Sequence, residues 1–131
     1  MTRILYELTG SENRRFSPYC WRTRMALAHK GLACQYEPCG FTQKDKIAFS
    51  GHQSYPVLVD GDAVATDSWD IACYLDDNYR DAPSLFNDGG DGGGRAMAYF
   101  INSWTDTQLH PAILRTIIFD VYKHLLPEDT D

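Results

Sequence analysis

The sequence predicts an α/β protein, with a mixed four-stranded sheet that has helices on its faces and is followed by the start of an all-helical part. Three observations favour this fold class. Strand-like and helix-like segments alternate over residues 3–79, an Asp-Gly pair separates two apolar runs within residues 56–66, and a glycine-rich stretch at 87–94 precedes helical spacing. Alternating strands and helices favour helices packed on a sheet, and Asp-Gly between apolar runs is typical of a tight hairpin.

The first half of the sheet is expected to come from a strand–helix–strand unit within residues 3–37. Residues 3–8 (RILYEL) are apolar and rich in strand formers, and residues 34–37 (CQYE) alternate in polarity like a second strand. Between them, Ser17 and Pro18 suit the N-cap and the first position of a helix. A right-handed β-α-β unit follows from this order.

The helix after Ser17 is expected to run to about Lys30, because Gly31 suits the left-handed residue that ends a helix and Leu32 can complete a Schellman motif. Its spacing predicts one face in the core and one in solvent. The predicted core face consists of Trp21, Met25, Leu27 and Ala28, and the predicted solvent face consists of Arg22, Arg24 and Lys30.

The second half of the sheet is expected to be a hairpin over residues 56–66, which turns at its Asp-Gly pair and opens with a proline at the first strand position. A helix follows over residues 67–79. Residues 39–54 are weakly patterned, with one short helical turn around 43–49. The order β-α-β, then β-β-α, is the thioredoxin-like arrangement.

Three parts are therefore expected along the chain. A thioredoxin-like domain spans residues 1–86, a glycine-rich linker spans 87–94, and the beginning of a helical domain, incomplete in this chain, spans 95–131. The last part shows helical spacing on both sides of Pro111, which predicts two helices interrupted there.

The composition excludes several classes of protein. The 131 residues contain 44% hydrophobic residues, which favours a globular protein, and Lys+Arg 12 against Asp+Glu 18 gives a net charge of −6. Without a basic run, neither nucleic acid nor an acidic membrane surface is an expected partner. No apolar run is long enough for a membrane span and no signal-peptide core is visible at the N-terminus, so a cytoplasmic location is expected.

Cysteine and histidine spacing predicts no metal site. The four cysteines and four histidines are scattered without a Cys-x-x-Cys pair or a zinc-ligand pattern. We expect Cys34, Cys39 and Cys73 to be reduced packing residues, and Cys20 is considered separately below.

The start of the helix at Ser17 is the best candidate for chemistry. Free backbone N–H groups and the positive end of the helix dipole converge there, and such a position stabilises a thiolate or a carboxylate. The alternative is that Ser17 is a plain N-cap, which is the commoner role of a Ser-Pro pair.

Three motifs in this order resemble the glutathione S-transferase family. They are Ser17-Pro18-Tyr19-Cys20 after the first strand, Tyr55-Pro56-Val57-Leu58 before the third, and Asp67-Ser68-Trp69-Asp70-Ile71 with Tyr74-Leu75 in the next helix. The resemblance runs from about Ile4 to the C-terminus. Within the family, Ser-Pro-Tyr-x-Trp-Arg-Thr, Gly40-Phe41-Thr42 and Asp67-Ser68-Trp69 look like the bacterial branch that contains the glutathione-dependent β-aryl etherases.

The resemblance implies a glutathione transferase, with glutathione as cosubstrate, no metal, and a small hydrophobic electrophile as the second substrate. Ser17 would donate a hydrogen bond to the glutathione sulfur and favour its thiolate, as the catalytic group. At the glutathione-binding positions, Ser68 would bind the γ-glutamyl carboxylate and Asp67 its ammonium group. Their alternative role is a doubled N-cap of the second long helix.

The resemblance also implies a cis peptide before Pro56, which would expose the Tyr55 main chain for strand-like pairing with the cysteinyl part of glutathione. An ordinary trans proline at a strand start is the alternative. Gln53 or Lys44 is the candidate for the glycyl carboxylate. Cys20 stands where a redox pair has its second cysteine, and Ser17 replaces the first. Cys20 is therefore either buried packing or a possible redox residue that forms a mixed disulfide with glutathione.

Three functions thus remain open: a transferase, a truncated or non-catalytic glutathione-binding or interaction module, and a glutaredoxin-like thiol transferase that uses Cys20. Only 37 residues follow the predicted linker, whereas the family has a longer helical domain. We expect a homodimer or a longer chain to cover the apolar stripe, which comprises Phe100, Ile101, Trp104, Leu114, Ile117 and Ile118.

Overall fold

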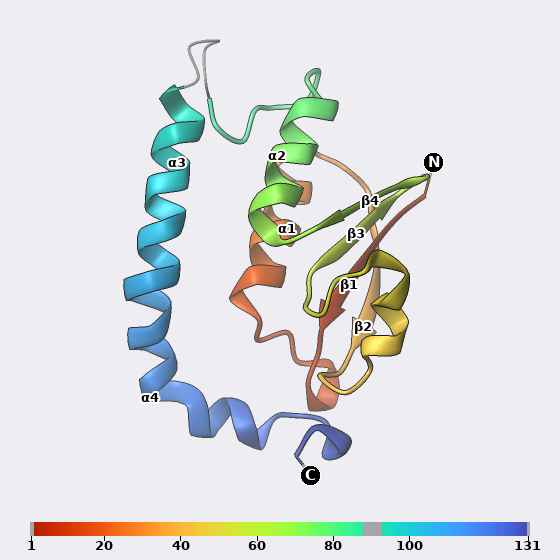
Figure 1. Cartoon of the computed structure of the whole chain (residues 1–131), viewed down its shortest axis with the longest axis vertical. Coiled ribbons are helices and arrows are strands. Elements are labelled where there is room, and N and C mark those ends of the chain that lie inside the picture. The colour runs from red at the N-terminus through yellow and green to blue at the C-terminus, as the bar shows by residue number, and fades with distance from the viewer. Residues whose placement is uncertain (1, 88–92, 131) are drawn as a thin grey trace.

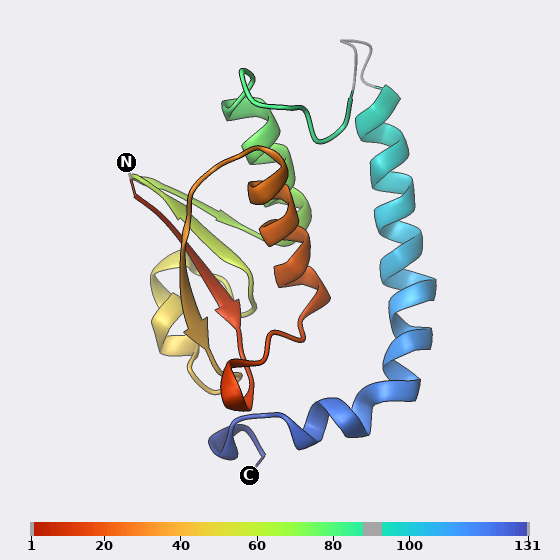
Figure 2. The same cartoon turned by 180° about the vertical axis from the view of Figure 1, so that it is seen from behind.

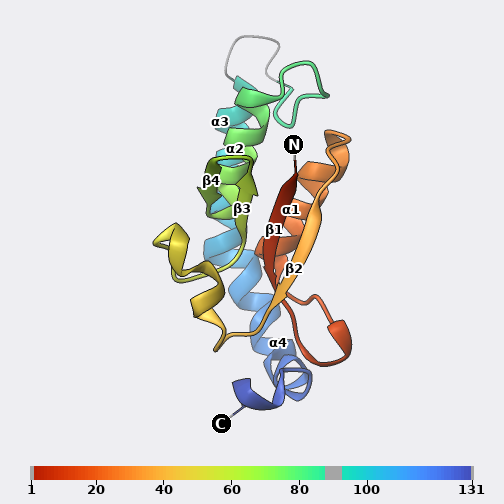
Figure 3. The same cartoon turned by 90° about the vertical axis from the view of Figure 1, so that its right-hand side faces the viewer.

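A computed structural model describes residues 2–87 and 93–130 and shows a four-stranded mixed sheet (Figure 1). The strands are β1 (Arg3–Leu8), β2 (Gln35–Cys39), β3 (Val57–Asp60) and β4 (Ala63–Thr66), in the order β2-β1-β3-β4. β1 is parallel to β2, whereas the β1–β3 and β3–β4 pairs are antiparallel. Figure 3 shows all four strands side by side. The predicted thioredoxin-like sheet and its hairpin are confirmed.

Two helices cover one face of the sheet and a shorter one covers the other. α1 (Pro18–His29) and α2 (Ser68–Asn78) lie together on one side, and η2 (Lys44–Ser50) lies on the opposite side (Figure 2). A short turn, η1 (Ser11–Asn13), interrupts the loop between β1 and α1. The weak helical turn expected around 43–49 is therefore η2.

The helical tail stands beside α1 and α2, on the side away from the sheet. α3 (Gly93–Trp104) continues through a π-helical turn (Thr105–Leu109) into α4 (His110–Lys123), which turns toward the loops after β1 and β2 and ends in η4 (Pro127–Asp129) (Figures 1 and 2). Pro111 sits in the first turn of α4, where proline is tolerated. Most of the predicted linker, residues 88–92, lies outside the described residues.

The core lies on both faces of β1, because successive side chains of a strand point to opposite sides. Leu5 packs against α1 and α2, together with Leu27, Leu58 and Ile71. Leu8 faces the other way, in a second buried cluster with Ile47, Cys20, Cys39, Tyr55 and Val57. This second cluster joins the start of α1 to the segment that enters β3.

α1 begins and ends where the sequence predicts, but its buried and exposed faces differ from the predicted ones. Gly31 has φ +66, Leu32 N–H donates to the Leu27 carbonyl at 2.9 Å, and the Schellman motif is complete. However, Trp21 is 44% exposed, Met25 is 63% exposed and Ala28 is exposed as well, so the predicted core face is correct only for Leu27.

The predicted solvent face of α1 is wrong too, because two of its cations have buried partners. Lys30 is buried, and its Nζ lies 2.9 Å from an Asp76 carboxylate oxygen. Arg24 donates from both Nε and Nη2 to Glu7 at 2.6 Å. Helical spacing reports which residues share a face, whereas these pairs depend on carboxylates supplied by β1 and α2.

Candidate functional site

Ser17 is the N-cap of α1, as predicted, and its hydroxyl group can both accept and donate a hydrogen bond. The residue is buried and has extended backbone geometry, and its Oγ accepts a hydrogen bond from Cys20 N–H at 3.3 Å. The same hydroxyl lies close enough to the Cys20 thiol to act on its pKa. A hydroxyl can accept and donate at the same time, so this group can stabilise a helix and still donate to an anion beside it.

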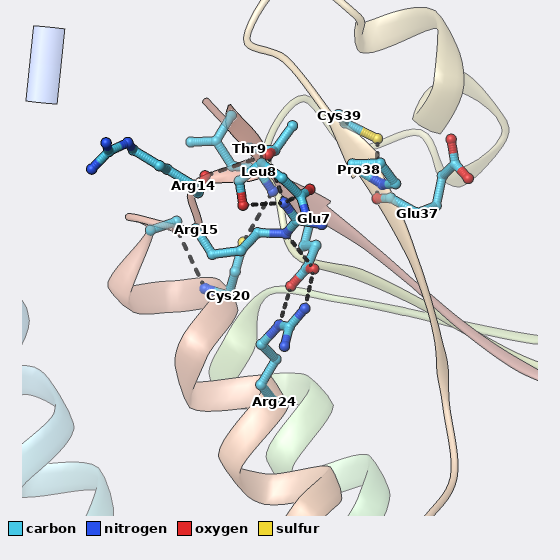
Figure 4. Close-up of polar contacts among 12 residues, drawn as sticks. Glu7, Leu8, Thr9, Arg14, Arg15, Cys20, Arg24, Glu37, Pro38 and Cys39 are labelled. Carbon is cyan, nitrogen blue, oxygen red and sulfur yellow. Dashed lines mark hydrogen bonds and ion pairs between the residues drawn. The ribbon is translucent and has the colours of Figure 1, made fainter. Parts of the chain in front are cut away.

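Cys20 lies one turn further along α1 and is inaccessible. It is 1% exposed, and its Sγ accepts a hydrogen bond from Leu8 N–H at 3.4 Å (Figure 4). Burial raises the pKa of the Cys20 thiol, although the contacts with Ser17 and Leu8 oppose the change. A thiol that is buried and protonated is a poor nucleophile, and the packing role is the one that the geometry favours.

The Tyr55–Pro56 peptide bond is cis, as the resemblance implied. The Tyr55 side chain is held at its hydroxyl end, because the one hydroxyl proton is shared between the carbonyls of Gly40 at 3.2 Å and Gln43 at 3.0 Å. Tyr55 shares the second buried cluster with Cys20. The structure therefore brings the segment before Pro56 close to the start of α1.

Asp67 and Ser68 open α2 with an unusual backbone. Asp67 is exposed, accepts a hydrogen bond from Trp69 N–H at 2.9 Å, and has φ +66, which is rare for a residue with a Cβ. Such a conformation costs on the order of 1–3 kcal/mol and is found mostly where function requires it. Ser68 is buried beneath it. The strain was not visible in the sequence, which indicated only a capped helix.

The two candidates for the glycyl carboxylate differ in their surroundings. Lys44 Nζ lies 4.5 Å from the centroid of the Tyr55 ring, and burial lowers the pKa of this ammonium group while nearby Asp129 raises it. Gln53 is an exposed side chain in the turn before Tyr55. The structure therefore brings Lys44 into contact with the Tyr55 segment and leaves Gln53 on the surface.

The buried carboxylate of Glu7, which sequence analysis missed, holds the loop before Ser17 in place through Arg15. Glu7 of β1 is fully buried between Arg24 and Arg15, whose Nε donates to it at 2.7 Å (Figure 4). Arg15 also donates to Thr9 Oγ1 at 2.7 Å, and its carbonyl accepts from Trp21 Nε1 at 2.8 Å. The only signal in the sequence is one glutamate within an apolar strand.

Tyr19 connects the start of α1 to the helical tail. Its ring meets the His110 ring edge-to-face at 5.4 Å, and the guanidinium of Arg22 lies 4.8 Å from its centroid. Arg22 in turn pairs with Asp106 at 2.7 Å and donates to Asn102 at 3.0 Å. Burial raises the pKa of Tyr19, with Asp106 and Asp67 acting in the same direction and Arg22 against them.

Two cavities lie between α3 and the first two helices, away from Ser17. One of about 850 Å³ is lined by residues that include Lys30, Asp76 and Arg95, and one of about 650 Å³ by residues that include Met25, Ser68 and Ile101. Of the residues predicted to bind glutathione, only Ser68 contributes to either. Among the described residues, no cluster of three or more His, Cys, Asp or Glu side chains could hold a metal ion, and no helix is long and apolar enough to cross a membrane.

The sheet order, the cis proline and a capping serine where β1 leads into α1 define a thioredoxin-like protein without a redox cysteine pair. Comparison with known proteins gives the family. The family profile "Glutathione S-transferase, N-terminal domain" matches residues 13–84, more than half of the chain. The chain belongs to the glutathione S-transferase family.

Individual relatives agree with this assignment. Glutathione S-transferase Z1 of Arabidopsis thaliana is 39% identical over 91 residues, which cover 61% of this chain and 41% of that protein. The crystal structure of glutathione transferase GSTFuA3 from Phanerochaete chrysosporium superimposes with a TM-score of 0.84 at 28% identity, over 99% of this chain and 57% of that one.

Other solved structures share the fold. A glutathione S-transferase of Ceriporiopsis subvermispora, crystallised in complex with glutathione, has a TM-score of 0.82 at 20% identity, over 99% of this chain and 56% of that one. The chain thus spans about half the length of the relatives that it matches.

Proposed function

We propose that this chain binds glutathione and acts as a glutathione transferase on a small hydrophobic electrophile, with Ser17 stabilising the glutathione thiolate. The observation that carries the proposal is the Ser17 hydroxyl at the N-terminus of α1, whose oxygen accepts the capping hydrogen bond and which, as a hydroxyl, also carries a proton that it can donate to a bound sulfur. In the reaction, the thiolate electron pair forms a bond to the electrophilic carbon. The leaving group departs with its own bonding pair, or the pair of an opened double bond is protonated by solvent.

The hydrogen bond from Ser17 would act by lowering the pKa of the bound thiol. A shift of about two units raises the thiolate population near neutral pH roughly a hundredfold, which corresponds to about 2.7 kcal/mol. The orphan N–H groups of the first turn of α1 support the same anion. Serine is an electrostatic stabiliser in this mechanism, and the sulfur of glutathione is the nucleophile.

The other residues proposed to bind glutathione suit a tripeptide that carries a carboxylate at each end. At α2, the exposed Asp67 carboxylate suits the γ-glutamyl ammonium, and Ser68 suits the adjacent carboxylate. Tyr55, before cis Pro56, offers main-chain groups for the cysteinyl part. Lys44 suits the glycyl carboxylate better than Gln53, since it is the one that contacts Tyr55. A solved relative with this fold holds glutathione in its crystal.

The proposal extends to branch, assembly and compartment. The segments Ser17–Thr23 and Gly40–Thr42 support a place near the bacterial β-aryl etherases. Homodimer formation is supported by the large apolar side chains that α3 and α4 leave exposed, among them Phe100 and Phe119. We place the protein in the cytoplasm, as expected from its sequence.

Variants of Ser17 test the mechanism without confusing it with helix capping. Ser17→Gly removes the hydroxyl at a cost of only a few tenths of a kcal/mol to the cap and adds no charge, whereas Ser17→Thr keeps both the capping oxygen and the proton. We expect Ser17→Gly to lower kcat/KM with glutathione and chlorodinitrobenzene by about a hundredfold, and Ser17→Thr to retain most of the activity. Thiolate absorbance of bound glutathione against pH should show the pKa returning toward that of a free thiol in Ser17→Gly.

Two outcomes would favour the other functions. Binding of glutathione without turnover in the wild type would indicate a binding module. Loss of thiol transfer in Cys20→Ser, with Ser17 variants unaffected, would indicate glutaredoxin-like chemistry. The burial of Cys20 argues against the second outcome.

A further inference from the structure

The end of the described chain, residues 124–130, crosses the loop that leads to Ser17. The His124 carbonyl accepts hydrogen bonds from Ser11 N–H at 2.7 Å and from Ser11 Oγ at 3.2 Å. Gly10 makes this approach possible, because a Cβ at this position would lie 2.1 Å from the His124 oxygen. In Figures 1 and 2 the end of α4 lies directly against this loop.

The same segment also holds the loop after β2. The Asp129 carboxylate accepts from Phe41 N–H at 2.9 Å, from Thr42 N–H at 2.8 Å and from Thr42 Oγ1 at 2.8 Å. Hydrogen bonds to an ionised acceptor are about twice as strong as neutral ones. Gly40 again permits the contact, since a Cβ there would lie 2.7 Å from Leu126 Cδ1 and 2.9 Å from Asp129 Oδ2.

Both loops lead to residues proposed to bind glutathione. The first ends at Ser17. The second supplies the carbonyls of Gly40 and Gln43 that hold the Tyr55 hydroxyl. The two loops also meet directly, because the rings of Phe16 and Phe41 stack at a centroid separation of 6.1 Å. The position of the Tyr55 main chain relative to Ser17 therefore depends on how these loops are held.

Asp129 also affects the protonation of the Lys44 ammonium group. Its charge favours the ammonium form of Lys44, against the burial that lowers the pKa of this group. Lys44 lies over the Tyr55 ring and is the better candidate for the glycyl carboxylate. One carboxylate thus influences both the main-chain and the charged contacts expected for one end of glutathione.

We propose that Asp129 is a positioning residue of the glutathione site, which fixes the loop at residues 40–43 and with it Tyr55 and Lys44 relative to Ser17. This inference rests on the proposed binding of glutathione. It assigns to the helical tail a part in binding the tripeptide, through residues that do not touch it. Asp129 has no role at the reacting sulfur, so its loss should affect binding and leave the chemical step intact.

The test compares Asp129→Asn with the neighbouring Glu128→Gln, which removes the same charge one residue away. The amide of Asp129→Asn keeps one acceptor oxygen but turns an N–H group toward donors, which breaks at least one of the three hydrogen bonds. We expect the Kd for reduced glutathione, measured by titration calorimetry, and the KM for glutathione to rise about tenfold. The kcat at saturating glutathione and the pKa of the bound thiol should stay within about twofold and a few tenths of a unit. Glu128→Gln should match the wild type.

The outcomes separate this inference from the proposed function. If the wild type does not bind glutathione, both fail. If the wild type binds and Asp129→Asn binds equally well, only the role of Asp129 fails, and a fall in unfolding midpoint alone would reduce it to a structural contact. Tighter binding by Asp129→Asn would mean that the tail obstructs the site, which also overturns the inference. A loss of kcat without a change in Kd would contradict it as well.

Discussion

The two halves of this chain, residues 2–87 and residues 93–130, differ in how far their apolar side chains are buried. In the first half, leucines and isoleucines from the sheet, α1, α2 and η2 close two fully buried clusters. In the second half, neither α3 nor α4 contains a buried residue, and Phe119 is 79% exposed. Tertiary packing supplies most of the stability of helices in proteins. The first half is therefore stabilised by its own core, whereas the second half depends on its contacts with the first.

The largest effect is expected from a substitution in the core of the first half. Ile71 is fully buried, and Ile71→Ala should lower the free energy of unfolding by about 2–5 kcal/mol through lost burial and a residual cavity. The matched change in the second half is Ile117→Ala, at a residue that is 41% exposed, and it should cost about 0.5 kcal/mol or less. Urea unfolding of both variants measures the contrast. Equal losses would show that the helical half has a core of its own.

The next effect concerns the buried carboxylate on β1. Glu7→Gln leaves Arg15 and Arg24 without their charged partner, and we expect a loss of about 2 kcal/mol, less than for a fully enclosed pair because both arginines are partly exposed. Glu37→Gln removes a more exposed partner of Lys46 and should cost about 0.5 kcal/mol. Urea unfolding at neutral pH measures both variants. If Glu7→Gln were no worse than this control, the Glu7 network would not fasten the first half.

An acid titration should sharpen the same comparison. Burial tends to raise the pKa of Asp76, but hydrogen bonds from Leu85 N–H, Lys30 and Ser84 outweigh it, so the pKa lies below its ordinary value of 3.8. A carboxyl group with a lowered pKa stabilises the fold above that ordinary value and loses the effect as the pH falls through its own pKa. Because Lys30 Nζ keeps its hydrogen bonds to the carbonyls of Tyr79 and Pro83, Asp76→Asn should cost only about 1–1.5 kcal/mol at pH 7 and become indistinguishable from the wild type in strong acid.

Urea midpoints of the wild type and Asp76→Asn, recorded from pH 7 down into acid, check this prediction. Asp62→Asn, an exposed change in the hairpin turn, is the control and should leave the curve unchanged. A gap between the wild type and Asp76→Asn that widens on acidification would contradict the sign.

The smallest effect on global stability is expected at the joint between the halves. Asp106→Asn weakens the pair with Arg22, whose partners are both partly exposed, and should cost less than about 1 kcal/mol overall. Because this pair holds the middle of the helical tail against α1, amide exchange within residues 105–123 should accelerate by up to about fivefold. Asp120→Asn, which removes an exposed partner of Lys123, should change neither quantity. Uniform acceleration through both halves would mean that they unfold as one unit.

The sequence predicted those features that are determined locally. The N-cap at Ser17, the left-handed Gly31, the Asp-Gly hairpin and the cap at Asp67 each depend on a few neighbouring residues, and the structure confirms them. The mixed four-stranded sheet followed from the β-α-β unit and from the hairpin. The cis bond before Pro56 was expected only from the family resemblance.

The features that escaped sequence analysis depend on partners far along the chain. Lys30 looked like a solvent residue because nothing near it in sequence revealed the Asp76 carboxylate. Glu7 was counted within an apolar first strand, and nothing near it in sequence revealed that α1 supplies Arg24. Likewise, Asp129 lies in a polar end whose composition gives no sign that its carboxylate reaches the loop after β2. A residue's local pattern cannot report an ion pair that only the folded chain creates.

The joint made by the end of the chain uses mostly main-chain groups of the first half. His124 and Asp129 meet the N–H groups of Ser11, Phe41 and Thr42, and every amino acid except proline carries this donor. On the side of the first half, this joint depends on side-chain identity only through the hydroxyls of Ser11 and Thr42 and the two glycines that allow the close approach. A helical tail with a different pocket could therefore be joined to an unchanged first half at this point, provided that it places a carbonyl opposite Ser11 and a carboxylate opposite residues 41 and 42.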